Sequence, residues 1–252
     1  MIKKLSKILL IIIGVIVLLV AGFVLWLSIN EFNPEPVSDV DIEANSRIGE
    51  LSPYEGQEIS LISWNIGYGG LGKEADFFMD GGRESRARSR QAVDENMRGI
   101  VAFVKGLSPD FALFQEVDIY GTRSWHIAED AYLDDAMGDN EFNEVFAQNY
   151  DSPYLFYPLI NPHGANQSGI LTLSRHPISS AVRRSLPIET GLMKLVDLDR
   201  CYSVSRVPME NGRELVLYNL HLSAYTSDGT IATEQLEMLC ADMLAEYENG
   251  NY

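Results

Sequence analysis

The sequence predicts an α+β fold class: a two-sheet β-sandwich flanked by helices, preceded by one N-terminal transmembrane helix. Three observations support it. Many short apolar segments are joined by short connections, which favours hairpin pairing over a doubly wound parallel sheet. Two longer stretches have the amphipathic helical repeat, so each needs a sheet face to cover. An apolar run near the N-terminus has the length of a membrane span.

The first segment is a candidate membrane anchor. Residues 8–27 are apolar throughout, and at about 1.5 Å per residue this helix is roughly 30 Å long, which matches a bilayer core. Lys3, Lys4 and Lys7 precede it, so residues 1–7 are expected in the cytoplasm and the main domain outside the cell. A cleaved signal peptide is the alternative, but its apolar core would be only about 7–15 residues. We therefore expect a single-pass protein of the cell membrane.

Residues 28–57 are polar and acidic and contain three prolines, so they are expected to form an extracytoplasmic tether. The folded domain is then expected at residues 58–252. Beyond the anchor the chain has all 36 acidic residues but 16 of the 19 basic ones, a net charge of −20. This charge disfavours nucleic acid as a substrate, whereas a small phosphate ester remains compatible because a bound metal ion inverts the field locally. Cys201 and Cys240 are too few for a disulfide framework, and one bridge or two free thiols both remain open.

The first strand is expected at residues 58–65, and an amphipathic helix is expected at about 89–106. The apolar residues of that helix recur with the helical repeat at positions 93, 97, 100, 101 and 104. Residues 110–117 are almost wholly apolar, which predicts a central strand.

The middle of the chain is predicted to be rich in strands. Short β-segments are expected at 144–146, 154–159, 169–174 and 181–185. Residues 199–222 predict a hairpin, because Asn211-Gly212 joins two apolar arms. A closing helix is expected at about 230–247, with its apolar stripe covering a sheet. That stripe comprises residues 232, 236, 239, 240, 243, 244 and 247.

Two strand ends present oxygen donors suited to a hard divalent cation. Asn65 ends the first strand, and Glu116 ends the central strand. Taken singly, each is more simply a turn residue or a solvated strand end. Mg²⁺ keeps several waters and takes only one or two protein carboxylates, so the pair predicts a Mg²⁺ site, with Mn²⁺ as the alternative metal.

Four other residues are candidates for contact with a phosphate group. His221, at the end of a hairpin arm, is the catalytic candidate because its imidazole can hydrogen-bond a phosphoryl oxygen, although a buried structural histidine is the alternative. Asn219 lies on the same face of that strand. Arg86 is one of four arginines in a short run, interpreted either as a phosphate clamp or as a solvated helix start. Ser168 precedes a glycine that more simply permits a bulge.

Together these motifs resemble the endonuclease/exonuclease/phosphatase superfamily over about residues 58–247. Ser63-Trp64-Asn65 resembles its first metal-site motif, and Gln115-Glu116 resembles its metal-binding glutamate. Asn219-Leu220-His221-Leu222 is similar to its Asn-Thr-His-Leu element, with Leu in place of Thr. Residues 168–178 resemble its central strand. The resemblance implies metal-dependent hydrolysis of phosphate esters.

The sequence departs from the family pattern toward its C-terminus. The family's Asp-x-Asn, which supplies the general base, and its terminal Asp-His pair have no counterpart after Tyr225. Asp94-Glu95-Asn96 has the first spacing, but it lies in a predicted helix and in the wrong order. We therefore expect a C-terminally truncated relative with an incomplete second sheet and little activity.

Two functions are consistent with these expectations. The first is a membrane-anchored, outward-facing Mg²⁺-dependent phosphoesterase that acts on a phosphomonoester or phosphodiester. A phospholipid head group or a small phosphodiester is favoured over nucleic acid as its substrate. The alternative is a non-catalytic, surface-anchored binding or remnant domain. The membrane is the expected partner, and no protein partner is predicted.

Overall fold

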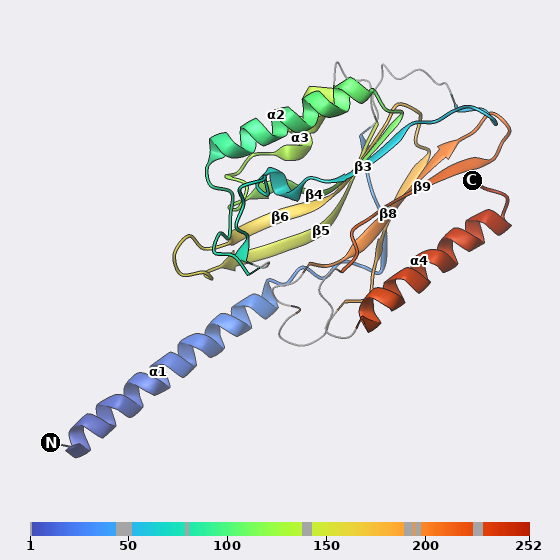
Figure 1. Ribbon diagram of the computed structural model, residues 1–252. Helices are drawn as coiled ribbons and strands as arrows, with labels where there is room; N and C mark the ends of the chain where they lie inside the picture. The colour runs from blue at the N-terminus through green and yellow to red at the C-terminus, as the bar shows by residue number, and fades with distance from the viewer. Residues whose placement is uncertain are drawn as a thin grey trace.

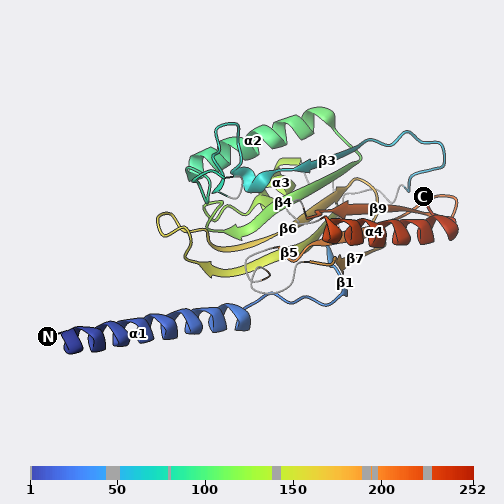
Figure 2. The same ribbon diagram turned by 60° about the horizontal axis from the view of Figure 1, so that its bottom comes forward.

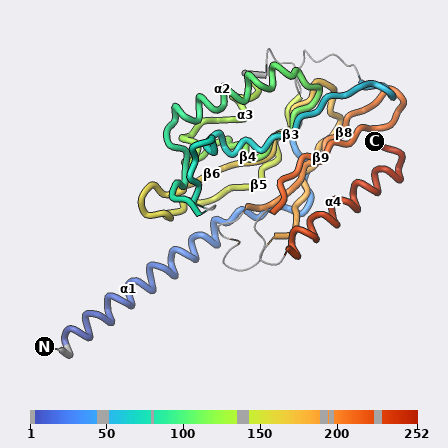
Figure 3. Tube along the Cα trace, viewed as in Figure 1, coloured from blue at the N-terminus to red at the C-terminus, as the bar shows by residue number. Residues whose placement is uncertain are grey.

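The computed structural model describes residues 2–43, 52–78, 81–137, 143–188, 194, 198–223 and 229–252. Two β-sheets pack face to face, and helices cover the outer face of each sheet (Figures 1 and 2). One long helix, α1 (Ile2–Ile29), leaves the domain at its N-terminal end (Figure 3). The predicted α+β class is confirmed.

The larger sheet has five strands in the described residues, in the order β2-β5-β6-β4-β3. These strands are β2 (Ile42–Glu43), β3 (Leu61–Asn65), β4 (Phe111–Gly121), β5 (Asn143–Leu155) and β6 (Gly164–Ser174). Only β3 and β4 are parallel neighbours, and the other pairs are antiparallel. The strand expected at 154–159 was wrong, because β5 runs on from Asn143 to Leu155 as one strand, paired with β6 as far as Leu155.

The smaller sheet has four described strands, in the order β1-β7-β8-β9, all antiparallel. They are β1 (Val37–Asp39), β7 (Ser180–Ser185), β8 (Cys201–Pro208) and β9 (Glu214–Leu220). The predicted hairpin is confirmed as β8 and β9, with Gly212 at the turn in the left-handed region at φ +79°. Tyr252 lies beside the edge of β9, accepting from Val216 N–H and donating to Glu214 O, each at 2.9 Å.

Helix α2 (Arg90–Leu107) covers the five-stranded sheet, and its five predicted apolar residues are all buried. The Ser89 hydroxyl caps the helix by accepting from Ala92 N–H. Helix α3 (Glu129–Met137), which was not predicted, lies beside it (Figure 1). A short 3₁₀ turn, η1 (Gly67–Gly69), follows β3.

Helix α4 (Thr230–Glu248) covers the four-stranded sheet, but with a different face from the one predicted. Of the expected stripe, Leu239 is buried, whereas Leu236, Met243, Leu244 and Tyr247 are exposed. The sheet-facing side is set by polar contacts. These are made by Gln235 to Pro187 O and Ser223 N–H, by Asp242 to Arg184 and by Glu246 to Arg206. The packed face of α4 therefore combines these polar contacts with the apolar packing of Met238 and Leu239, and it differs from the face that the apolar repeat predicted.

The segment expected to be an extended tether is folded in part. Residues 37–39 pair with β7 and residues 42–43 pair with β5, so each sheet gains an edge strand there. The side chains of Val40 and Ile42 pack against a core cluster around Phe111 and Val207. The acidic residues and prolines around these few apolar side chains led the sequence analysis to predict an extended tether instead of two short strands. Residues 44–51 of the expected tether lie outside the described part of the chain.

Candidate metal and phosphate site

Two side chains meet where β3 and β4 end. The strands are parallel and in register, with Asn65 beside Gln115, so their carboxyl ends reach the same edge of the sheet. Asn65 Nδ2 donates to Glu116 Oε1 at 2.9 Å, and Asn65 Oδ1 accepts from Gly67 N–H at 2.9 Å. The expected convergence of Asn65 and Glu116 is present, with the amide nitrogen rather than the oxygen turned toward the carboxylate.

A β-bulge aims Glu116. This residue has a left-handed backbone, at φ +56°, and the pairing of β4 with β6 shifts register between Gln115 and Val117. Gly169 faces the bulge, where a Cβ would lie 2.5 Å from the Phe146 ring. Bulges of this kind re-aim side chains, and backbone strain concentrates at functional sites. Gly169, which the sequence pattern associated with a bulge, therefore lies opposite the bulge that presents Glu116.

His221 reaches the same place from the other sheet. It follows β9, and its Nε2 lies 3.5 Å from Glu116 Oε1, with the two side chains 15% and 20% exposed. Burial, followed by the positive charges of Arg200 and Arg123, lowers the pKa of His221 to about 3. The imidazole is therefore neutral near neutral pH and carries one N–H that can be donated. Its Nδ1 is buried without a hydrogen-bond partner among the described residues.

Asn219 lies between the two sheets rather than in the site. It is only 1% exposed. Its Oδ1 accepts from Gln115 Nε2 at 2.7 Å, and its Nδ2 donates to main-chain carbonyls of β4 and β6. These bonds tie β9 to β4 just beside Glu116. Asn219 therefore holds His221 in place from within the core and is not positioned to touch a substrate.

Arg86 and Ser168 do not join this group. Ser168 is buried, and its hydroxyl donates to Val117 O at 3.1 Å, which supports the bulge from behind. Arg86 is partly exposed, donates to Asn161 Oδ1 at 2.8 Å and lies over the Trp125 ring at 4.8 Å. Ser168 thus has a structural position, and Arg86 lies beside the β5–β6 loop.

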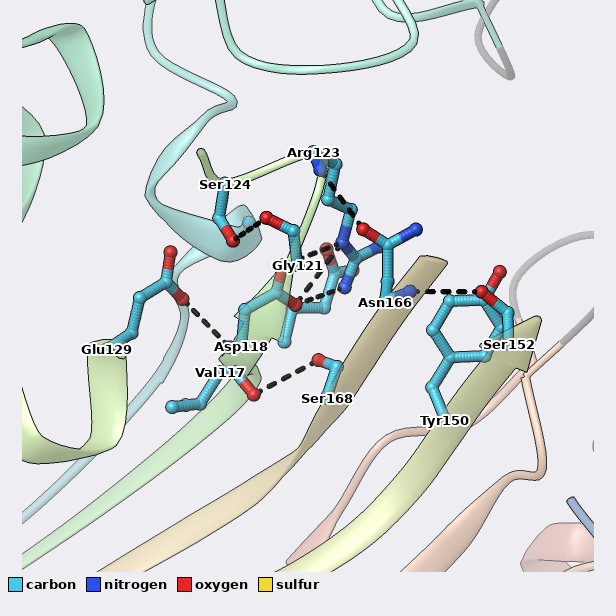
Figure 4. A network of polar contacts seen from close by, with 12 residues as sticks. Val117, Asp118, Gly121, Arg123, Ser124, Glu129, Tyr150, Ser152, Asn166 and Ser168 are labelled. Carbon is cyan, nitrogen blue, oxygen red and sulfur yellow. Dashed lines mark hydrogen bonds and ion pairs between the residues drawn. The ribbon is translucent and has the colours of Figure 1, made fainter. Parts of the chain in front are cut away.

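A buried cluster of charged residues lies directly behind the bulge (Figure 4). Arg123 forms a bidentate ion pair with Asp118, with Nη2 at 2.7 Å from Oδ1, and it lies 4.3 Å from the Tyr68 ring centroid. Asp118 N–H donates to Glu129 Oε2 at 2.9 Å. Burial, together with the Asp118 charge, raises the pKa of Glu129 well above its usual range. The contacts fix β4 two residues beyond Glu116.

Sequence reasoning missed this cluster. Asp118, Arg123 and Glu129 are spaced as ordinary solvated charges, and their burial follows only from the turn after β4. The available signal was Asp118, a charge directly after the strand predicted to be central, since buried charges need partners.

A pocket of about 500 Å³ opens beside Asn65 and Glu116 and continues under α2 along Asn96 and Gly99. Within the described ranges, no three His, Cys, Asp or Glu side chains gather as a metal cage. One carboxylate facing an open pocket suits Mg²⁺, which keeps most of its waters. Asn65 fits less directly, because its oxygen accepts from Gly67 and would have to turn or be shared. The donor types nevertheless fit this metal.

Comparison with known protein families matches residues 62–242 to the Endonuclease/Exonuclease/phosphatase family. A search of curated proteins found no match. The fold is similar to that of an endonuclease/exonuclease/phosphatase from Beutenbergia cavernae DSM 12333, with TM-score 0.50 and 19% identity over 72% of this chain and 43% of that chain. It is also similar to ANGEL2, a 2',3'-cyclic phosphatase, with TM-score 0.50 and 16% identity over 84% of this chain and 52% of that chain. The chain spans about half the length of these solved structures.

Proposed function

Because the chain belongs to the endonuclease/exonuclease/phosphatase family, we propose that it forms the metal- and phosphate-binding part of a Mg²⁺-dependent phosphoesterase. One observation carries the proposal. Asn65 and Glu116 line one pocket from adjacent strands, and His221, which follows a strand of the other sheet, reaches to 3.5 Å from Glu116.

Each residue has a distinct part in this proposal. Glu116, with Asn65, would hold Mg²⁺, which when bound polarises a phosphoryl oxygen and an attacking water. The neutral imidazole of His221 would donate a hydrogen bond to a phosphoryl oxygen and stabilise charge that develops there. Arg123, buried behind the bulge, adds positive potential. We assign no general base.

We propose further that α1 anchors this domain in the cell membrane. Its segment Lys4–Ile29 is the one described helix long and apolar enough to cross a bilayer, 26 residues or about 39 Å, and of the residues in it only Leu27, near its end, is buried. Basic residues at its start support a cytoplasmic N-terminus, with the tether and residues 58–252 outside the cell. A phospholipid head group or a small phosphodiester then suits the acidic domain better than nucleic acid.

Metal binding is the direct test. Mn²⁺, measured by electron paramagnetic resonance on the full chain in detergent and displaced by Mg²⁺, is expected to bind at one site. Glu116→Gln is expected to weaken binding at least about tenfold, because it removes the carboxylate charge. Glu237→Gln, an exposed position on α4, is the matched control and should bind normally. Equal Mn²⁺ affinity in wild type and Glu116→Gln would refute the proposed site.

A non-catalytic binding domain is the second candidate, because the pocket beside Asn65 and Glu116 could hold a phosphate ester without cleaving it. Turnover of bis(p-nitrophenyl) phosphate separates the two. Mg²⁺-dependent release of nitrophenol that Glu116→Gln abolishes would show that this chain is itself catalytic. Calorimetric binding of a phosphate ester that is unchanged in Glu116→Ala would instead favour the binding domain.

A further inference from the structure

The loop between β5 and β6 is unusually apolar and unusually exposed. Leu159 is 90% exposed and Ile160 is 84% exposed, and Phe156 and Tyr157 beside them are also mostly exposed. Single exposed apolar residues are ordinary, whereas a contiguous group of four marks a surface that contacts something else. We define this group, residues 156–160, as the apolar loop.

The apolar loop lies against the end of α1. The Phe156 ring is 5.6 Å from the ring of Phe23, which in turn stacks on Trp26 at 5.9 Å. Figures 1 and 2 both show the loop projecting on the side toward which α1 leaves the domain. Aromatic residues at the end of a membrane span lie at the lipid–water interface. A bilayer crossed by α1 would therefore reach the apolar loop at the same level.

Basic residues flank the apolar loop in an otherwise acidic domain. The arginine run at 83–90 is held to the loop by two contacts, Ser85 Oγ to Asn161 O and Arg86 Nη2 to Asn161 Oδ1. The Phe78 ring lies 6.3 Å from that of Tyr157. Apolar side chains bordered by arginines suit insertion among anionic lipid head groups.

We propose that the apolar loop inserts into the interface of the same membrane that α1 crosses, with the neighbouring arginines on anionic head groups. This inference rests on the proposed anchor. The contact with Phe23 places the apolar loop at the same depth as the end of the membrane span. We therefore infer that this surface binds lipid rather than a protein.

The inference also narrows the substrate class. Gly121, at the end of β4, pairs with Asn166, and Leu155 pairs with Gly164, so β4 ends at the loop side of the sheet. Glu116 lies five residues earlier, roughly 17 Å along the strand. An inserted loop would hold the phosphate pocket close to the head groups, which favours an amphiphilic phosphate ester presented by the membrane.

Site-specific fluorescence on the full chain tests the insertion. In a Cys240→Ser background, which leaves buried Cys201 as the only native thiol, the dye NBD is attached at Ile160→Cys, at Tyr247→Cys or at Leu18→Cys. The protein is placed in phosphatidylcholine nanodiscs with or without phosphatidylglycerol, and nitroxide lipids serve as quenchers. Tyr247, near the C-terminal end of α4, is the matched exposed control, and Leu18, within α1, reports on the anchor itself.

We expect quenching and a blue shift at positions 18 and 160 and neither at 247. Phosphatidylglycerol should strengthen the effect at 160, and Arg83→Gln should weaken it. Quenching at 18 with a water-exposed probe at 160 would overturn the insertion while leaving the anchor intact. A probe at 160 that is shielded from iodide but not quenched by lipid would indicate a protein contact and would also overturn it. No quenching at 18 would reject the anchor and the insertion together.

Discussion

The two halves of the sandwich are covered by helices in contrasting ways. On the five-stranded side, α2 buries an uninterrupted apolar stripe that includes Val93, Met97 and Val104 at zero exposure. On the four-stranded side, α4 buries only Gln235 and Leu239, packs Met238 partly against the sheet, and is held in addition by ion pairs and hydrogen bonds. Both sheets are covered by a helix, but α2 buries more apolar side chains than α4 does.

The half with the denser apolar packing also contributes most residues of the candidate site. The α2 half contributes Asn65 and Glu116 and encloses the charged cluster behind the bulge, whereas the α4 half contributes His221 alone. Dense apolar packing tolerates little displacement, and ion pairs near the surface tolerate more. We infer that the half that contains Asn65 and Glu116 is the more stable one. The following predictions test this contrast, beginning with the largest expected effect.

Arg123→Met should destabilise the protein by about 3–5 kcal/mol, because it leaves Asp118 as a buried carboxylate without its ion-pair partner. The free energy of unfolding is measured by urea denaturation of the full chain in detergent micelles. The double variant Arg123→Met/Asp118→Leu should recover part of the loss. A single-variant loss below about 1 kcal/mol would show that the cluster contributes little.

Met97→Ala and Met243→Ala form a matched pair, the same change in the helix of each half. Met97 is fully buried, and its truncation should lower the free energy of unfolding by about 2–5 kcal/mol. Met243 is 47% exposed, so its truncation should stay within about 0.5 kcal/mol. Equal losses in the two variants would remove the proposed contrast.

Glu144→Gln should stabilise the protein at alkaline pH. Glu144 pairs with Glu43 across β2 and β5, and burial, followed by the charges of Glu43 and Asp130, raises its pKa to about 8. A carboxyl with a raised pKa destabilises the fold progressively as pH rises from its unfolded value of about 4.5 toward 8. The gain in Glu144→Gln should therefore be about 1–3 kcal/mol at pH 8 and close to zero at pH 4. A gain that is independent of pH would reject this explanation, and Glu237→Gln serves as the control.

Glu246→Gln should have the smallest effect. This residue pairs with Arg206 on the partly exposed face of α4, and such pairs contribute less than about 1 kcal/mol. The loss should shrink further in high salt because the pair is screened. A larger loss that does not depend on salt would mean that α4 is as firmly packed as α2.

The sequence predicts the positions of those residues that end a strand with a clear apolar pattern. Asn65 and Glu116 each end an apolar strand, and His221 follows a hairpin arm, so the pattern picked out three side chains that lie together in the structure. The same reasoning misassigned Asn219, because period-two alternation does not distinguish a face turned to a pocket from one turned to the opposite sheet. It also missed Asp118, Arg123 and Glu129, which lie close together in the sequence but are buried and paired only because of the turn that follows β4.

The helices α2 and α4 also differ in how much of their packing the sequence predicts. The stripe of α2 was predicted residue by residue because apolar burial follows the helical repeat. The packed face of α4 was not, because Asp242 and Glu246 pair with arginines on strands far away in the sequence. A repeat records burial, but it does not record which partner a charged residue will meet.

The sequence by itself determined the α+β class, the apolar N-terminal span, the strand ends with Asn65 and Glu116, and the hairpin that carries His221. These depend on hydrophobic periodicity and turn residues, which are local properties. Only the tertiary structure decided which way Glu116 is aimed, which charges are buried behind it and which loop lies beside Phe23. Those outcomes depend on the register of β4 against β6 and on contacts between residues far apart in the chain, and the order of residues does not encode such contacts in any local pattern.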